Sequence, residues 1–310
     1  MESPTLHSRF TQPDKFTFGT FQTPDGHTCR YGVMPHDQPI GNIVILHGFS
    51  EFIEKFYETI RDFHNAGYQV YTFDWRGQGK SERYFKDKLE QVYHTGFDRD
   101  TEQLHTFMQS VVTGPGPNYA LAHSMGGHIL LRALYQDPQM FRAVSLSAPM
   151  LRFRLPMPRF LAWGVLKVVR ALKWNERGIG GGDWSAKCPP IARDPRSRDP
   201  ERRMVHYEWC RRDPELRLGP VSFEWVYHAL RSVVVTEAPG YLETINTPVL
   251  IGMAEGDRIV ENTAIKTAAK RLPNARLLPL ADAEHEILME RDAIRQRFLS
   301  ETLAFFDQNR

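Results

Sequence analysis

The stretch YALAHSMGGHILLRAL (Tyr119–Leu134) decides the fold that we predict for this chain. An apolar run ends at Ser124, small residues flank that serine, and a second apolar run with helical spacing follows at once. A strand that turns sharply into a helix would hold one side chain clear of the backbone at the carboxyl end of a sheet, as in a nucleophile elbow. The usual first glycine of that pattern is Ala122 here. The alternative is a serine that caps an ordinary helix.

Short apolar runs alternate with helical patterns on both sides of this stretch. A hairpin with its turn at residues 24–26 comes first. The runs that we expect to be strands of the main sheet are NIVILHG, YQVYTFDW, YALAHS, AVSLSAP, TPVLIGM and ARLLPL. Strands that alternate with helices predict an α/β protein with a mostly parallel, doubly wound sheet.

The alternation stops for about ninety residues between two halves of the predicted core. We expect residues 1–150 and 241–310 to form the core and residues 151–240 to form an inserted, mainly helical cap subdomain. The insertion carries 17 Lys and Arg against 10 Asp and Glu, whereas the remainder carries 22 against 27. Its most biased part, RDPRSRDPERR (Arg193–Arg203), is expected to be a solvated loop.

A helix is predicted over RFLAWGVLKVVRALKW in the insertion. Its apolar face comprises Leu161, Val165, Val168, Val169 and Leu172, and its basic face comprises Lys167, Arg170 and Lys173. One interpretation packs the apolar face on the core with the cations in solvent. The other places the helix on an anionic lipid surface, where it would guide an acyl chain inward.

A serine nucleophile needs a base, and the base needs an acid to hold it in the right tautomer. In this fold both partners should follow late strands, in the order serine, acid, histidine. Asp257 follows the strand VLIGM and His285 follows the strand ARLLPL. We therefore predict a catalytic triad of Ser124, Asp257 and His285.

Other histidines and carboxylates compete for these roles. His47 and His123 lie next to glycine-rich turns, but neither follows a late strand, so structural roles are expected for both. Glu255, Asp282 and Glu284 compete with Asp257, and their simplest interpretation is a solvated loop carboxylate.

Acyl transfer also needs donors for the developing oxyanion, usually two backbone N–H groups. Met125 should supply one, because it directly follows the predicted nucleophile. Phe49, in the loop LHGFSE after an early strand, is the best candidate for the other.

Composition excludes several classes of function. The 310 residues have a formal charge of +2, which does not suggest binding to nucleic acid. Three widely spaced cysteines, Cys29, Cys188 and Cys210, fit neither a disulfide framework nor a structural zinc site. The glycine-rich stretches GQGKS and GIGGGD do not complete a nucleotide-binding motif. We expect no cofactor and no metal, and a cytoplasmic protein that could lie peripherally at the inner face of the membrane.

Six ordered motifs resemble those of the α/β-hydrolase superfamily, within its monoglyceride-lipase-like branch. They are ILHGFSE, FDWRGQGKSER, LAHSMGGHILLRAL, LSAPM, EGDRIV and AEHEILME. The elbow AHSMG and the loop RGQG are most similar to those of bacterial lysophospholipases. The resemblance implies an α/β-hydrolase fold, the triad Ser124, Asp257 and His285, and an oxyanion hole at Phe49 and Met125.

The reaction expected from this resemblance is hydrolysis of the carboxylic ester of a monoacyl lipid through an acyl-enzyme. A lysophospholipid or a monoacylglycerol would be the small-molecule substrate, and the basic cap would allow contact with an anionic membrane. Three alternatives stay open: a peptidase or amidase, an acyltransferase on the same triad, and a non-catalytic binding module. The head group, the acyl-chain length and the regiospecificity depend on the shape of the cap.

Overall fold

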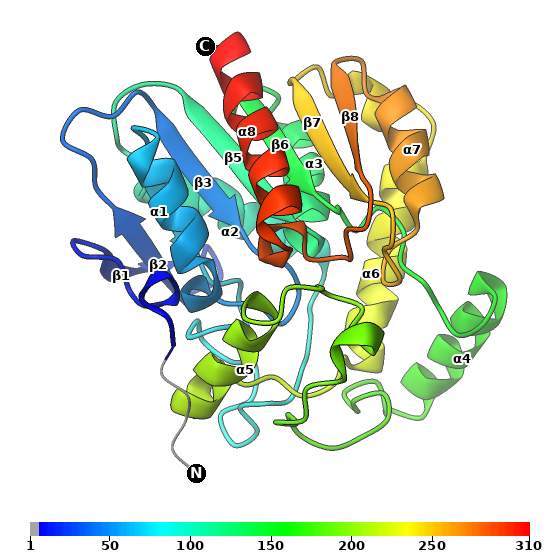
Figure 1. Cartoon of the computed structure of the whole chain (residues 1–310). Coiled ribbons are helices and arrows are strands. Elements are labelled where there is room, and N and C mark those ends of the chain that lie inside the picture. Colours follow the sequence, from blue (N-terminus) through cyan, green and yellow to red (C-terminus); the bar gives the residue numbers. More distant parts are fainter. Residues whose placement is uncertain (1–5) are drawn as a thin grey trace.

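The computed structural model describes residues 6–310 and contains an eight-stranded sheet (Figure 1). The strands are β1 (Thr17–Gln22), β2 (Thr28–Met34), β3 (Asn42–Leu46), β4 (Gln69–Phe73), β5 (Asn118–His123), β6 (Ala143–Ser147), β7 (Val249–Ala254) and β8 (Ala275–Leu280). Their order across the sheet is β1-β2-β4-β3-β5-β6-β7-β8. β2 pairs antiparallel with β1 and β4, and all the other pairs are parallel. The predicted α/β class with a mostly parallel sheet is confirmed.

The central strands are buried on both faces. Every residue of β3, β6 and β7 is buried, and these strands read as continuous runs of apolar or small side chains. Parallel strands covered by helices on both sides need such runs instead of an alternating pattern. The short apolar stretches in the sequence were therefore a sufficient signal for this part of the sheet.

The predicted hairpin forms the antiparallel edge of the sheet. Gln22 pairs with Thr28 across its turn, and Gly26 has a φ of +85°. Glycine adopts this left-handed conformation at little cost because it has no Cβ.

Helices cover both faces of the sheet (Figure 1). α1 (Tyr57–Asn65) and α8 (Asp292–Gln308) pack through one apolar cluster on one face. The other face is covered by α2 (Phe97–Ser110), α3 (Met125–Gln136), α6 (Phe223–Glu237) and α7 (Asn262–Arg271) through a second cluster.

The predicted insertion leaves the core after β6 and returns to it at β7. It contains α4 (Arg159–Ala171), α5 (Arg202–Arg212) and α6, and Figure 1 shows α4 and α5 beyond the carboxyl ends of the parallel strands. α6 packs differently, because its Ser232 hydroxyl is bonded to His128 (2.7 Å) and Arg132 (2.6 Å) of α3. We therefore propose that the cap proper ends before α6.

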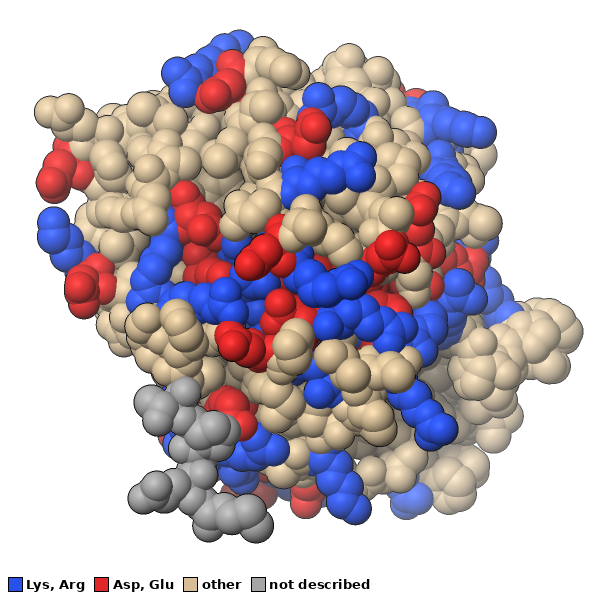
Figure 2. All heavy atoms as spheres, viewed as in Figure 1, with Lys and Arg blue, Asp and Glu red and all other residues tan. Residues whose placement is uncertain are grey.

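The apolar stripe predicted on α4 faces away from the core. The buried side chains of this helix are Ala162 and Leu166. Four of the five stripe residues, Leu161, Val165, Val168 and Leu172, are exposed, and Val169 is half-buried. The interpretation that packs this stripe on the core is therefore wrong. In Figure 2 the edge of the molecule over α4 is largely uncharged. No helix within residues 6–310 is both long and apolar enough to cross a membrane.

Candidate active site

Ser124 lies on a sharp turn between β5 and α3, and its φ of +49° is in the left-handed region. Such a conformation costs a residue other than glycine about 1–3 kcal/mol and persists only where the surroundings enforce it. Two backbone hydrogen bonds do so here, from Ser124 N to Ser147 O (3.0 Å) and from Met150 N to Ser124 O (2.9 Å). The sequence pattern of an elbow thus corresponds to a serine in a strained backbone conformation that two hydrogen bonds stabilise.

The residues at positions 122 and 126 around Ser124 are small for different structural reasons. A Cβ on Gly126 would lie 2.6 Å from the carbonyl oxygens of Leu46 and His47, so only glycine fits there. Ala122 stands where the elbow pattern usually has glycine, but it is a β5 residue without a positive φ. A methyl group is therefore tolerated at that position.

The three predicted triad side chains meet at the carboxyl edge of the sheet. The Ser124 hydroxyl lies 2.9 Å from His285 Nε2, and His285 Nδ1 lies 2.7 Å from Asp257 Oδ2. All three side chains are buried, although they come from the turns after β5, β7 and β8. In this order the carboxylate accepts from Nδ1, so Nε2 is free to accept the serine proton.

The carboxylate of Asp257 is held in its charged form. Its Oδ1 accepts hydrogen bonds from Ile259 N (2.7 Å) and Val260 N (2.9 Å). Burial alone would raise the pKa of Asp257, but the hydrogen bond and charge of His285 and these two N–H groups outweigh burial and lower it. An ionised Asp257 can therefore stabilise an imidazolium at His285.

The loop with Phe49 lies against Ser124, because a Cβ on Gly48 would approach the Ser124 Cβ to 3.1 Å. Gly48 N donates to Glu51 Oε2 (2.5 Å) and Ser50 N donates to Gln78 Oε1 (2.5 Å). Between them, the N–H of Phe49 donates to no protein acceptor within residues 6–310.

Met125 is the first residue of α3, and its N–H has no acceptor within the described part of the chain either. First-turn N–H groups lack partners inside a helix. The sites of the two predicted oxyanion donors thus both carry a free N–H, and their role in the reaction stays a prediction.

The competing histidines are engaged elsewhere. His47 lies against Asp74 (3.4 Å) and is fully buried. His123 points its Nδ1 at Ser147 O (3.1 Å), and burial lowers its pKa to about 4. Both arrangements are those of structural side chains.

The competing carboxylates also lie away from the imidazole nitrogens. Glu255 and Asp282 are exposed, as expected of solvated loop carboxylates. Glu284 is buried and pairs with Arg198 and Arg258, so the expectation of a solvated carboxylate is wrong for this residue. Among these candidates, Asp257 is the carboxylate hydrogen-bonded to His285.

A pocket of about 550 Å³ opens beside Ser124 and His285. Most of its wall is apolar, formed by Phe49, Met150, Phe153, Leu155, Ile179, Val221, Trp225, Val226, Ile259 and Val260. The ring of Phe49 packs on that of Trp225 with centroids 4.7 Å apart. This wall can hold a hydrocarbon chain next to the serine.

Sequence reasoning missed the way in which the insertion holds the histidine loop. His285 N donates to Pro195 O (3.3 Å) and Glu286 N donates to Arg196 O (2.7 Å). The buried Glu290 carboxylate accepts from the backbone N–H groups of both Glu284 and Arg198. The expectation of a solvated loop at 193–203 is therefore wrong, because this segment packs against the loop that carries His285.

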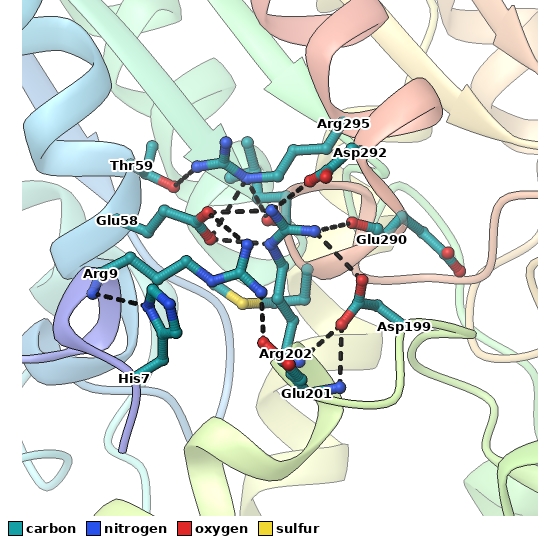
Figure 3. Close-up of polar contacts among 12 residues, drawn as sticks. His7, Arg9, Glu58, Thr59, Asp199, Glu201, Arg202, Glu290, Asp292 and Arg295 are labelled. Carbon is teal, nitrogen blue, oxygen red and sulfur yellow. Dashed lines mark hydrogen bonds and ion pairs between the residues drawn. The ribbon is translucent and has the colours of Figure 1, made fainter. Parts of the chain in front are cut away.

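Arg202 of α5 completes this attachment (Figure 3). Its guanidinium contacts Glu58 of α1 (2.7 and 2.9 Å), Asp199 (3.1 Å) and Asp292 of α8 (2.5 Å). The Arg202 side chain is 1% exposed, so its pairs with the largely buried Glu58 and Asp199 are shielded from water, whereas Asp292 is exposed. No local sequence period predicts the cluster, since Glu58 and Asp292 lie far from Arg202 in the chain.

A second buried cluster links the Phe49 loop to the histidine loop. Lys55 Nζ lies 2.7 Å from Glu51 and 2.8 Å from Glu286, and all three side chains are buried. The only sequence signal was the spacing of Glu51 and Lys55, four residues apart in EFIEK. Among residues 6–310 no group of histidine, cysteine or acidic side chains is arranged to hold a metal ion.

Comparisons with known proteins agree with this architecture. The chain is 31% identical over 296 residues to lysophospholipase L2 of Escherichia coli, with 90% of this chain and 83% of that protein covered. It is 25% identical to phospholipase YtpA of Bacillus subtilis, with 74% and 80% covered. A soluble variant of monoglyceride lipase from Saccharomyces cerevisiae, solved with a substrate analogue, matches the fold with a TM-score of 0.74, 18% identity and 99% of both chains covered.

Residues 37–292 match the hydrolase family described as serine aminopeptidase, S33. This match spans most of the chain, including the elbow and both late turns. The chain belongs to this family, within the α/β-hydrolase superfamily.

Proposed function

We propose that this protein hydrolyses the carboxylic ester of a monoacyl lipid, a lysophospholipid or a monoacylglycerol, through an acyl-enzyme. The observation that carries the proposal is the hydrogen-bonded series Ser124, His285 and Asp257 opening on a mostly apolar pocket. The names of the relatives, two phospholipases and a monoglyceride lipase, support the same class of substrate.

In the proposed reaction, Ser124 Oγ attacks the acyl carbonyl while His285 Nε2 takes its proton. The N–H groups of Phe49 and Met125 bind the oxyanion that develops, and removing one such donor typically costs about 10²–10³ in turnover. His285 then protonates the departing alcohol. Water, activated by the same imidazole, hydrolyses the acyl-enzyme and releases the fatty acid.

The test is release of fatty acid from a lysophospholipid and from a matched monoacylglycerol. Ser124→Ala should lower turnover on both by about 10⁴–10⁶ while the protein stays folded. Ser300→Ala is the matched control, since this exposed serine of α8 bonds only to the backbone of its own helix. A wild-type protein inactive on both lipids, or a Ser124→Ala variant that kept substantial activity, would overturn the proposal.

An aminopeptidase is the alternative suggested by the family description. A free amino terminus would need an unpaired carboxylate near the nucleophile. The two carboxylates that line the pocket, Glu51 and Glu286, both contact Lys55. This pairing favours the ester substrate, and an aminoacyl nitroanilide assay on the same preparation tests the alternative.

We also propose that α4 contacts an anionic membrane surface from the cytoplasmic side. Phe160 is 72% exposed and Val168 is 59% exposed, and the cations Lys167 and Lys173 are exposed near them. Basic amphipathic helices rest at such interfaces with their apolar side chains inserted. The three cysteines are unpaired, which fits a reducing compartment.

A further inference from the structure

Three arginines line the pocket beside Ser124: Arg154, Arg196 and Arg258. The wall around them is mostly apolar, so these cations stand out as groups that could orient a polar part of the substrate. Whether they can bind an anion depends on the partners that each guanidinium already has.

Arg196 is already paired with a carboxylate. It makes a two-pronged contact with Asp194 (2.9 Å for both bonds) and donates to the Tyr207 hydroxyl (2.9 Å). The guanidinium of Arg196 therefore stabilises the folded insertion.

Arg154 has no carboxylate partner within residues 6–310. The polar contact of its guanidinium is a long one, from Nη2 to the backbone oxygen of Asp257 (3.4 Å). Glu261 lines the adjoining groove with Arg154, but it pairs with Arg152 (3.5 Å). The exposed guanidinium of Arg154 is thus available to a ligand.

Arg258 is only partly neutralised. It contacts Glu284 (3.3 Å), but Arg198 binds the same carboxylate, so one negative charge faces two cations. Its Nη2 also donates to the backbone oxygen of Asp194 (2.7 Å), and nearly half of its side chain is exposed.

The acidic side chains that line the pocket do not pair with Arg154 or Arg258. Glu51 and Glu286 both contact Lys55, which balances one of their two charges. Neither carboxylate therefore occupies the guanidinium groups of Arg154 and Arg258.

Backbone pairing brings these two arginines to the same place. Phe153 forms an antiparallel bridge with Val260, and Arg154 N donates to Ile259 O (2.9 Å). Phe153 and Val260 belong to the apolar wall, so each cation is next in the chain, or nearly so, to a residue of the surface that would hold the acyl chain.

We propose that Arg154, assisted by Arg258, binds the phosphodiester of a lysophospholipid head group. This inference rests on the proposed function and narrows its substrate class from monoacyl esters in general to phosphate-bearing ones. Guanidinium groups bind phosphate oxygens through paired, charge-assisted hydrogen bonds, and a monoacylglycerol offers no such anion.

The experiment compares kcat/KM for a lysophosphatidylglycerol and for a monoacylglycerol with the same acyl chain. Arg154→Gln should lower the ratio of these two values about tenfold or more, mainly by raising KM for the phospholipid, because a hydrogen bond to a charged group contributes about 1.5–3 kcal/mol. Arg193→Gln, at an exposed arginine of the insertion outside the pocket lining, should leave the ratio unchanged. Glycerol 3-phosphate should also inhibit wild type more strongly than Arg154→Gln.

The outcomes separate the two proposals. An unchanged ratio in Arg154→Gln, or an equal loss on both substrates, would overturn the head-group assignment while leaving ester hydrolysis intact. A wild-type enzyme that cleaves neither substrate would instead refute the proposed function. A thermal unfolding curve like that of wild type shows that the variant is folded, and Arg154→Lys should restore part of the ratio because it restores the charge.

Discussion

The two helices of the cap differ in how they meet the rest of the molecule. The buried guanidinium of Arg202 ties α5 to α1 and α8 (Figure 3). The segment before α5 is hydrogen-bonded to the histidine loop. α4 instead buries only Ala162 and Leu166 and exposes an apolar stripe. Figure 2 shows the same contrast, with interleaved charges across the middle of the molecule and an uncharged edge over α4.

This difference separates two tasks within one insertion. The α5 side fixes the position of His285 through paired charges and backbone bonds. The α4 side presents apolar surface that nothing within residues 6–310 covers, and its Arg170 and Arg159 pair with Glu224 and Glu237 of α6. We infer that the first side serves catalysis and the second serves access to the lipid.

The largest effect is expected when the α5 anchor is removed. Arg202→Met would remove the closest cation from Glu58 and its buried partner from Asp199, leaving Glu58 with longer contacts to Arg9 and Arg295 (3.7 Å each). Breaking a buried pair costs about 3–5 kcal/mol of unfolding free energy. Urea denaturation measures this loss. Arg297→Met, at an exposed arginine of α8 without an ion pair in the described chain, should change stability by no more than about 0.5 kcal/mol. Equal stability of both variants would contradict the anchoring role.

A second test acts on α4 alone. Phe160→Ser combined with Val168→Ser should weaken binding to anionic vesicles about tenfold or more, because full burial of one such side chain contributes about 1.5–3 kcal/mol. Hydrolysis of a short, water-soluble ester should change little, since neither residue lines the pocket. Val234→Ser on α6, another exposed apolar residue, is the matched control in vesicle sedimentation. Vesicle binding that is the same in all three proteins would show that α4 is not the contact.

A third test concerns where the cap ends. Burial and the nearby charge of Arg132 lower the pKa of His128, which faces α6, to about 3. Since the unfolded chain binds this proton near pH 6.5 and the folded chain does not, stability should fall with decreasing pH by up to about 1.4 kcal/mol per unit between pH 6 and 4.

In the His128→Gln variant the titrating imidazole is absent, but the glutamine amide can still form a hydrogen bond with Ser232. Its unfolding free energy, measured in urea at several pH values, should therefore depend less steeply on pH than that of wild type. Parallel pH curves would mean that the α3 and α6 contact opens to water, as expected for part of a cap and not for part of the core.

The features that the sequence predicted well are local. The hairpin turn, the continuous apolar strands and the elbow around Ser124 each depend on a few neighbouring residues. Asp257 and His285 could be placed because each directly follows a recognisable late strand, and the structure brings both to Ser124.

The features that it missed depend on distant pairs. RDPRSRDPERR has the composition of a solvated loop, yet Asp194, Ser197 and Arg202 within it are buried. Asp194 pairs with Arg196 and Arg203 of the same stretch, but the contacts that attach the stretch to the core are distant. Glu58 lies 144 residues from Arg202, and Glu290 lies 92 residues from Arg198, so no window of sequence reveals these pairings. The orientation of α4 was ambiguous for a related reason, because its pattern specifies an apolar face but not what that face meets.

The hydrogen bonds from His285 and Glu286 to Pro195 and Arg196 have a consequence for redesign of this enzyme. Exchanging the whole insertion with that of a relative would replace the backbone acceptors that position the imidazole of His285. Any change in substrate selectivity would then be accompanied by a loss of turnover. Transplanting only residues 159–171 would leave those acceptors untouched. Chimaeras built at that narrower boundary should therefore keep turnover while changing which lipid aggregates they attack.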